Sequence, residues 1–331
     1  MTDGDKERTR FGIVGFGIMG ERFLRAALAH PEAPATIAGV WDPSPDAAAR
    51  LAALAPEVPF LPDAAAVIRA CECLYIATPP AAHLELAQAG FDAGRAVLLE
   101  KPLSHDTAGA RIFVDRAEAH GERAAVNYPM ASSPAVGRLA GWLEEGVVGT
   151  PTGLDIAVAF ADWPRPWQRD AAAWLGERAE GGFTREVVSH FLFLTLRLVG
   201  PLRLESARTT FPAGGGAETA VRATLGAGNI QASLRGAVGG TDREDTNLWT
   251  LRGTGGAIRL RDWSVAEREV DGIWIPDPDS QPNERTRLQV LAKQIDRAAL
   301  LTEGHPHALA TLREALQVQT VVEQILANKQ G

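Results

Sequence analysis

The first 127 residues alternate short apolar runs with longer segments in which apolar residues recur every three or four positions. Five runs read as buried strands, at Phe11–Val14, Thr36–Trp41, Cys71–Ala77, Ala96–Leu99 and Arg123–Val126. The periodic segments predict helices that follow Gly20 or begin near Asp46, Ala64, Ala81 and Thr107. Strands and helices that alternate in this way are typical of a parallel, doubly wound α/β sheet.

The pattern changes after Asn127. We expect an amphipathic helix at Ala135–Glu144, a buried helix that starts near Thr184 and continues to Val199, and two final helices, at Glu284–Leu300 and His307–Ala327. Runs rich in β-forming residues lie at Pro151–Ala161, Leu202–Thr210, Ala217–Leu225, Asn229–Arg235, Asn247–Arg252 and Ala257–Leu260. Glycine-rich turns between them favour an open, largely antiparallel sheet. The sequence therefore predicts two domains, residues 1–127 and 128–331, and the last helix is a candidate to pack back on the first.

A glycine turn follows the first strand. Gly15, Gly17 and Gly20 have the spacing G-x-G-x-x-G, which lets the backbone turn tightly and approach a pyrophosphate at the start of a helix. Asp42 ends the second strand roughly 20 residues later, where a carboxylate that binds ribose is expected. The spacing alone is weak, since glycine turns are common. With a strand before it, a helix after it and Asp42 beyond, it favours a dinucleotide site over an ordinary turn with a surface aspartate.

Composition limits the other classes of function. The chain has 331 residues, 46% of them hydrophobic, and a net charge of −8. Because it has no basic run, neither nucleic acid nor an anionic membrane is an expected partner, and no apolar run approaches the ~20 residues that span a bilayer. Cys71 and Cys73 lie two apart in one predicted strand and would point to opposite faces, so we expect packing residues rather than a disulfide or a metal pair. We expect a cytoplasmic protein.

Two further stretches carry candidate chemistry. Lysine is rare here, yet Lys101 ends the fourth apolar strand within Glu100-Lys101-Pro102. Glu186 and His190 are four apart on the predicted buried helix and would share a face. A carboxylate one turn from an imidazole can hold its tautomer and raise its basicity for proton exchange. The alternative is an ordinary pair of polar neighbours. We expect no metal, since no third ligand stands near.

These motifs, in this order, resemble the Gfo/Idh/MocA family of oxidoreductases, which includes glucose–fructose oxidoreductase-like and inositol dehydrogenase-like enzymes. The resemblance rests on Gly15-x-Gly17-x-x-Gly20, Asp42, Thr78-Pro79-Pro80-x-x-His83, Glu100-Lys101-Pro102, and Gly181-Gly182 followed by Glu186-x-x-x-His190. It implies an N-terminal Rossmann domain for the dinucleotide and a C-terminal α/β domain for substrate. It also implies that the exposed face of the second sheet joins subunits into a homodimer or homotetramer. Such enzymes mostly oxidise or reduce sugars, cyclitols or related carbonyl compounds with NAD(H) or NADP(H), without metal.

By this resemblance Lys101 hydrogen-bonds the reacting oxygen and His190 is the general acid/base. Glu186 stands where the family usually has the shorter Asp, and it would orient His190. The implied cofactor contacts are Gly15, Gly17, Ile18, Met19, Gly20, Asp42, Thr78, Pro79, His83, Glu100, Lys101 and Asn127. The implied substrate contacts are Lys101, Asn127, Trp167, Arg169, Glu186 and His190. For His83 and Asn127 a purely structural role stays open, and for the Trp- and Arg-rich loop around residue 167 so does a subunit contact.

Asp42 favours NAD(H) over NADP(H), because a carboxylate binds the ribose 2′-hydroxyl and repels a 2′-phosphate. We therefore expect a hydride-transfer enzyme that acts on a hydroxyl or carbonyl carbon. Phe193 stands where many sugar-handling relatives carry an Asp; it suggests a less hydroxylated substrate, and the alternative is an ordinary core residue. One alternative is a reductase of an imine or of a nucleotide-linked keto-deoxysugar. Another is a catalytically silent dinucleotide-binding regulatory protein.

Overall fold

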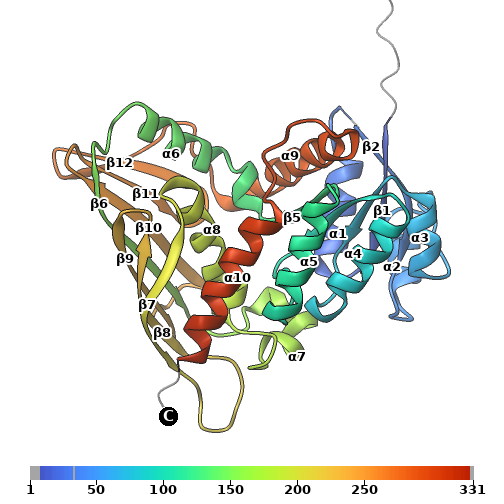
Figure 1. Cartoon of the computed structure of the whole chain (residues 1–331), viewed down its shortest axis with the longest axis horizontal. Coiled ribbons are helices and arrows are strands. Elements are labelled where there is room, and N and C mark those ends of the chain that lie inside the picture. The colour runs from blue at the N-terminus through green and yellow to red at the C-terminus, as the bar shows by residue number, and fades with distance from the viewer. Residues whose placement is uncertain (1–7, 33, 329–331) are drawn as a thin grey trace, which may run out of the picture. The chain divides into compact units, whose positions relative to one another are not determined.

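The computed structural model describes residues 8–32 and 34–328, and the chain divides into two compact units. Figure 1 labels many of their helices and strands. The first unit extends to Pro129 and also contains Leu288–Ala315. The second unit contains Met130–Arg287 and the chain from Leu316 onward.

The first unit is built on a five-stranded sheet with the order β2-β1-β3-β4-β5. Its strands are β1 (Thr9–Val14), β2 (Ala35–Trp41), β3 (Cys73–Ile76), β4 (Ala96–Glu100) and β5 (Ala124–Asn127). Every neighbouring pair is parallel, which confirms the predicted Rossmann-like sheet. The carboxyl ends of all five strands therefore lie along one edge, where ligands bind in open α/β sheets.

The helices that connect these strands are α1 (Ile18–Leu28), α2 (Ala47–Leu54), α3 (Ala64–Ala70), the short η1 (Pro80–Ala82), α4 (His83–Asp92) and α5 (Thr107–Ala119). Helix α9 (Asn283–Glu303) follows β13 in the chain, and its residues from Leu288 onward also belong to the first unit. Asp63 caps α3 by accepting a hydrogen bond from the Ala66 amide at 2.6 Å. The core of the unit includes Phe11, Phe23 and Tyr75, all 0% exposed, and α9 adds Leu291 and Ile295 to it.

The second unit contains an eight-stranded sheet with the order β13-β12-β11-β10-β6-β9-β8-β7. Its strands are β6 (Pro151–Phe160), β7 (Leu202–Thr210), β8 (Ala220–Ala227), β9 (Ile230–Val238), β10 (Asp245–Gly253), β11 (Ala257–Arg261), β12 (Val265–Val270) and β13 (Ile273–Pro276). All pairs are antiparallel except β6 with β9. The predicted open, largely antiparallel sheet is confirmed.

One face of this sheet is covered by helices. The helical elements are η2 (Pro129–Ser132), α6 (Pro134–Glu144), η3 (Pro166–Ala171), α7 (Ala172–Leu175), η4 (Thr184–Val188), α8 (Ser189–Leu198) and α10 (Leu312–Ala327). The indole of Trp249 in β10 donates to Thr195 of α8 at 2.9 Å, and Thr209 of β7 donates to the Ile325 carbonyl of α10 at 2.8 Å. In Figure 1, α6, α8 and α10 lie on the same side of the sheet.

The prediction differs from the structure in three respects. Strands β12 and β13 were not predicted; half of the residues of β12 are charged, and its buried Glu267 is paired with arginines. The last helix starts at Leu312 and not at His307, since the Ala310 carbonyl accepts the Val126 amide of β5 at 2.8 Å. The helix expected from Thr184 opens with a π-helical turn, η4, before the regular α8.

Candidate functional site

The turn after β1 has a different steric requirement at each glycine. Gly15 has φ +95°, and a Cβ there would lie 2.5 Å from the Ala77 carbonyl. A Cβ on Gly20 would overlap the Gly15 carbonyl oxygen, so this glycine allows α1 to pack closely. A Cβ on Gly17, the N-cap of α1, would meet nothing within 4 Å. The free space therefore lies where a phosphate could approach the helix N-terminus.

Asp42 lies at the end of β2 and contacts the same turn. Its carboxylate accepts the Phe16 amide at 2.6 Å and the Ser44 amide at 2.8 Å. Arg50 of α2 donates to the Phe16 carbonyl at 2.8 Å. Ile18 and Met19 form the first turn of α1. The glycine cradle and the carboxylate beside it fit the pyrophosphate and ribose of a dinucleotide.

His83 holds together the loops that follow β3 and β4. Its Nε2 lies 2.8 Å from the Thr78 carbonyl oxygen and its Nδ1 lies 2.9 Å from that of Pro102. Burial lowers the pKa of His83 and outweighs the opposing effect of both carbonyls. A neutral imidazole donates to one of these oxygens at a time. Pro79 separates Thr78 from η1 and is its N-cap. Both ring nitrogens of His83 thus lie against backbone carbonyl oxygens.

Glu100 and Asn127 face each other at the ends of β4 and β5. Glu100, 6% exposed, accepts a hydrogen bond from the Tyr75 hydroxyl at 2.5 Å and from the Asn127 amide nitrogen at 2.6 Å. The Asn127 side-chain oxygen accepts from Gln294 of α9 at 2.6 Å. Burial and the Glu100 charge raise the pKa of Tyr75 well above 10. The amide of Asn127 is therefore engaged within the first unit. Lys101 follows β4 and is half-buried.

In the second unit, Gly181 and Gly182 precede the helix that carries Glu186 and His190. Gly182 has φ +98°, and a Cβ there would overlap the Glu218 carboxylate. That carboxylate, 2% exposed, accepts the Thr184 amide at 2.6 Å and so satisfies a free amide at the helix start. Burial raises the pKa of Glu218. The Gly-Gly pair thus makes room for a buried acid that the sequence analysis did not single out.

Glu186 lies in the π turn and His190 in the first turn of α8. His190 is 8% exposed, whereas Glu186 is half-buried. Single π turns inside helices occur frequently at functional sites. Arg185 directly precedes Glu186 in the chain. It donates to both carboxylate oxygens of Glu323 in α10, at 2.6 and 2.8 Å. This bidentate pair anchors the π turn to the neighbouring helix.

A residue that sequence reasoning missed holds Glu186. Gln168 of η3, 2% exposed, donates from Nε2 to the Glu186 carboxylate at 3.3 Å. Its oxygen accepts from the Arg165 backbone amide at 3.3 Å and from Arg165 Nε at 3.1 Å. Arg165 in turn pairs with Asp245 of β10 at 2.9 Å. Because two donors hold the amide oxygen, the nitrogen must face Glu186.

The loop expected over the substrate is only partly in view. Trp167 is half-buried and stacks under the Arg165 guanidinium, 4.7 Å from the ring centroid. Arg169 lies in η3, but its side chain is outside the described part of the chain. The only sequence signal for Gln168 was its position between Trp167 and Arg169. The sequence did not specify which polar side chain of this loop points toward Glu186.

Across residues 8–32 and 34–328, no cluster of three or more His, Cys, Asp or Glu side chains is arranged to hold a metal ion. No helix within these ranges is long and apolar enough to cross a membrane. Both cysteines are buried free thiols, and burial raises the pKa of Cys71 to about 11 and that of Cys73 to about 12.

Comparison with known proteins identifies similar chains. Residues 9–128 match the family model described as an oxidoreductase family with an NAD-binding Rossmann fold. An inositol 2-dehydrogenase of Pseudomonas fluorescens is 31% identical over 152 residues, which cover 45% of each chain. A dTDP-3,4-didehydro-2,6-dideoxy-alpha-D-glucose 3-reductase of Streptomyces antibioticus is 28% identical over 97% of each chain.

The similarity varies in extent. For three of the four curated relatives, the match spans less than half of the relative's length: 23%, 45% and 40%. Among solved structures, a levoglucosan dehydrogenase in complex with NADH superposes with a TM-score of 0.83 at 17% identity, over 97% of both chains. At that identity the likeness shows a shared fold.

Proposed function

We propose, from the match of residues 9–128 to the family model, that the chain is an NAD(P)-dependent dehydrogenase or reductase of the Gfo/Idh/MocA family of oxidoreductases. Its substrate is a sugar, a cyclitol or a related small molecule with a hydroxyl or carbonyl carbon. The observation that carries the proposal is the turn after β1, where Gly15 and Gly20 are sterically closed and Gly17 is open. In this proposal residues 1–127 bind the dinucleotide and the substrate is bound within residues 128–331, of which Leu288–Ala315 belongs to the first unit.

The chemistry uses three side chains. When bound, NAD(P) supplies the hydride acceptor or donor at nicotinamide C4. His190 takes the hydroxyl proton during oxidation and returns it during reduction. The Lys101 ammonium stabilises the negative charge that develops on the substrate oxygen. Glu186 orients the imidazole, and Gln168 holds Glu186 in place through its 3.3 Å hydrogen bond.

We propose NAD(H) as the preferred cofactor. The Asp42 carboxylate is fixed by two backbone amides and can still accept from a ribose hydroxyl, since each oxygen has two lone pairs. It would repel a 2′-phosphate. Arg50 donates to the Phe16 carbonyl of the same turn. Because its guanidinium could pair with a 2′-phosphate, the arrangement is compatible with some use of NADP(H).

A nucleotide-linked keto-deoxysugar is the second candidate substrate. The support is the similarity to the Streptomyces antibioticus 3-reductase, which extends over 97% of both chains. Phe193 is 1% exposed, so it is a core residue and does not help to choose between the two candidate substrates.

We also propose a cytoplasmic homo-oligomer that forms through the open face of the second sheet. Arg208, Arg222 and Arg235 stand abreast there on β7, β8 and β9, and all three are exposed without a hydrogen bond or ion pair to another described residue. Like charges directly opposite each other destabilise a sheet. Carboxylates of a second copy would offset this repulsion.

Nicotinamide absorbance with a panel of substrates tests the activity: free sugars, inositols and a nucleotide-linked keto sugar. We expect Lys101→Ala and His190→Asn to lower kcat by about 100-fold or more while NADH binding persists. Lys293→Ala and His305→Asn are matched controls on exposed side chains and should retain activity. Full turnover in the Lys101 or His190 variant would refute the assigned roles, and no turnover of any substrate by the native protein would favour the silent regulatory alternative.

A further inference from the structure

The turn between β11 and β12 has an unusual backbone conformation. Asp262 and Trp263 have φ +47° and +72°, in the left-handed region. Asp tolerates that region moderately well, but a bulky residue such as Trp rarely occupies it. Backbone strain of this kind persists only where the surrounding structure enforces it, and it is concentrated at functional sites.

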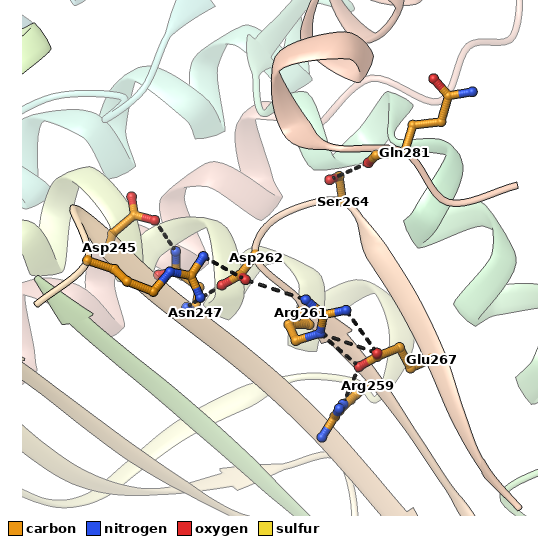
Figure 2. A network of polar contacts seen from close by, with 9 residues as sticks. Asp245, Asn247, Arg259, Arg261, Asp262, Ser264, Glu267 and Gln281 are labelled. Carbon is orange, nitrogen blue, oxygen red and sulfur yellow. Dashed lines mark hydrogen bonds and ion pairs between the residues drawn. The ribbon is translucent and has the colours of Figure 1, made fainter. Parts of the chain in front are cut away.

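A polar network holds the residue before Trp263 (Figure 2). The Asp262 amide donates to the Asn247 carbonyl at 2.9 Å, and the Asp262 carboxylate accepts the Asn247 amide at 3.3 Å. Arg243 adds a hydrogen bond to the same carboxylate at 3.1 Å, and Arg261 forms an ion pair with it at 3.6 Å. Asp262 therefore has partners on β10, on the loop before β10 and on β11.

The residue after Trp263 is also held. Ser264, 5% exposed, donates from Oγ to the Gln281 carbonyl at 2.7 Å, as Figure 2 shows. Both neighbours of the indole are thus anchored by hydrogen bonds to different parts of the second unit. The turn cannot relax to a less strained conformation without breaking one of these anchors.

The strained residue lies against His190. The Trp263 ring is 5.5 Å from the His190 ring, centroid to centroid, with the planes at 80°. It also packs on Phe191 at 5.2 Å. A T-shaped contact limits the rotation of the imidazole about its own axis. The indole is only half-buried, so a packing role in the core does not account for the strain.

We propose that Trp263 is a positioning residue for His190, and that the Asp262 network keeps its indole against the imidazole so that the ring nitrogens have a fixed direction. Only the expected effect on kcat depends on the proposed function; the contact between Trp263 and His190 does not. Trp263 adds a second supporting contact to the one already described, in which Gln168 holds Glu186.

One ion pair connects the two arrangements. Asp245 accepts from Arg165, which holds Gln168, at 2.9 Å and from the Asn247 side chain at 3.1 Å. Asn247 in turn binds Asp262. Glu186 is therefore linked to Asp262, the residue before Trp263, through a series of hydrogen bonds within the second unit.

The test begins with the imidazole itself. NMR spectra of protein with labelled histidine, assigned with His190→Asn, should show a ring-current shift of the His190 carbon-bound protons. In Trp263→Leu this shift should disappear and the signals should broaden, while Trp263→Phe should keep a shifted, sharp signal. Trp274→Leu, on β13, is the matched control and should leave the His190 signals unchanged. An unaltered His190 spectrum in Trp263→Leu would overturn the proposal.

Turnover provides the second measurement. Trp263→Leu should lower kcat by about 10- to 100-fold with KM nearly unchanged, because a small displacement of a reacting group is costly. Trp263→Phe should recover most of kcat. Thermal unfolding of each variant checks the fold, and Trp263→Gly, which suits the positive φ, should be stable yet slow. Normal kcat in a folded Trp263→Leu protein would contradict the proposed consequence.

The two measurements separate the possible failures. If the native protein turns over no substrate, the proposed function fails, but the NMR comparison still decides whether Trp263 holds His190. If the native protein is active and both Trp263→Leu and Trp263→Gly match it, Trp263 has no positioning role.

Discussion

At the scale of single residues, the glycines of the turn after β1 define the candidate cofactor site as much as the polar side chains do. Gly17 and Gly20 lie three residues apart in one motif, yet an added Cβ meets open space at Gly17 and the Gly15 carbonyl at Gly20. Gly17 thus leaves space in which a ligand phosphate can lie, whereas Gly20 is required for close packing within the chain. The two substitutions should therefore have separable effects.

We predict that Gly17→Ala leaves the free energy of unfolding nearly unchanged but weakens NAD(H) binding by about 10-fold or more, because the methyl group occupies the path of the pyrophosphate. Gly20→Ala should instead destabilise the fold by roughly 1–3 kcal/mol, as overpacking does. Urea unfolding and fluorescence titration with NADH measure the two quantities. Equal NADH affinity in Gly17→Ala and the native protein would mean that the phosphates bind elsewhere.

At the scale of elements, the helix that carries Glu186 and His190 begins over a buried acid. Glu218 accepts the Thr184 amide at 2.6 Å, and Gly182 leaves room for it. Burial raises the pKa of Glu218 above its ordinary value of 4.5. The folded state therefore binds the Glu218 proton more tightly than the unfolded state does.

This difference predicts a pH dependence. The contribution of Glu218 to stability is fully present below pH 4.5 and is lost as the pH rises through the higher pKa of the folded state, by at most about 1.4 kcal/mol per pH unit. Glu218→Gln keeps an acceptor for Thr184 and removes the charge. Its stability relative to the native protein should rise from pH 4.5 toward neutrality, measured by urea unfolding at each pH.

Glu244→Gln, at an exposed position of the same unit, controls for general charge effects and should show a flat difference across that range. If the Glu218→Gln difference is equally flat, the carboxyl is not stabilised in its protonated form.

At the scale of the whole molecule, the second sheet leaves one face without a helix among the described elements. A depression of about 260 Å³ lies on it, with Ala157, Ala220 and Ala237 among its lining residues and Arg222 and Arg235 beside them. Small side chains allow close approach of another surface, and the unpaired arginines favour an acidic one.

We predict that the native protein is oligomeric by sedimentation equilibrium and that Arg222→Glu with Arg235→Glu shifts it toward the monomer, because the charge reversal repels the carboxylates of the second copy. Arg69→Glu with Arg111→Glu, two exposed positions of the first unit, reverses the same charge and should leave the assembly intact. A double variant at 222 and 235 with native mass would exclude this face as the interface.

The local pattern was sufficient for the first unit because its elements follow from short-range rules. Buried strands there are continuous apolar runs, and each is followed by a turn and a periodic helix, so the parallel sheet and the positions of Gly15, Asp42, Thr78 and Lys101 at strand ends could be predicted. Strand β12 escaped prediction because its buried Glu267 depends on arginines from the neighbouring strand β11.

By itself, the sequence determined the fold class, the glycine turn and the residue types at the candidate site, since each depends on neighbours within a few positions along the chain. The tertiary structure alone decided which polar side chains turn inward. Gln168 bonds Glu186, 18 positions further along the chain, and Trp263, in the turn between β11 and β12, contacts His190 of α8. No local sequence pattern encodes such contacts, because the packing of a sheet against its helices brings these segments together. The same reason explains why Asp262 and Trp263 adopt a conformation that their own residue types disfavour.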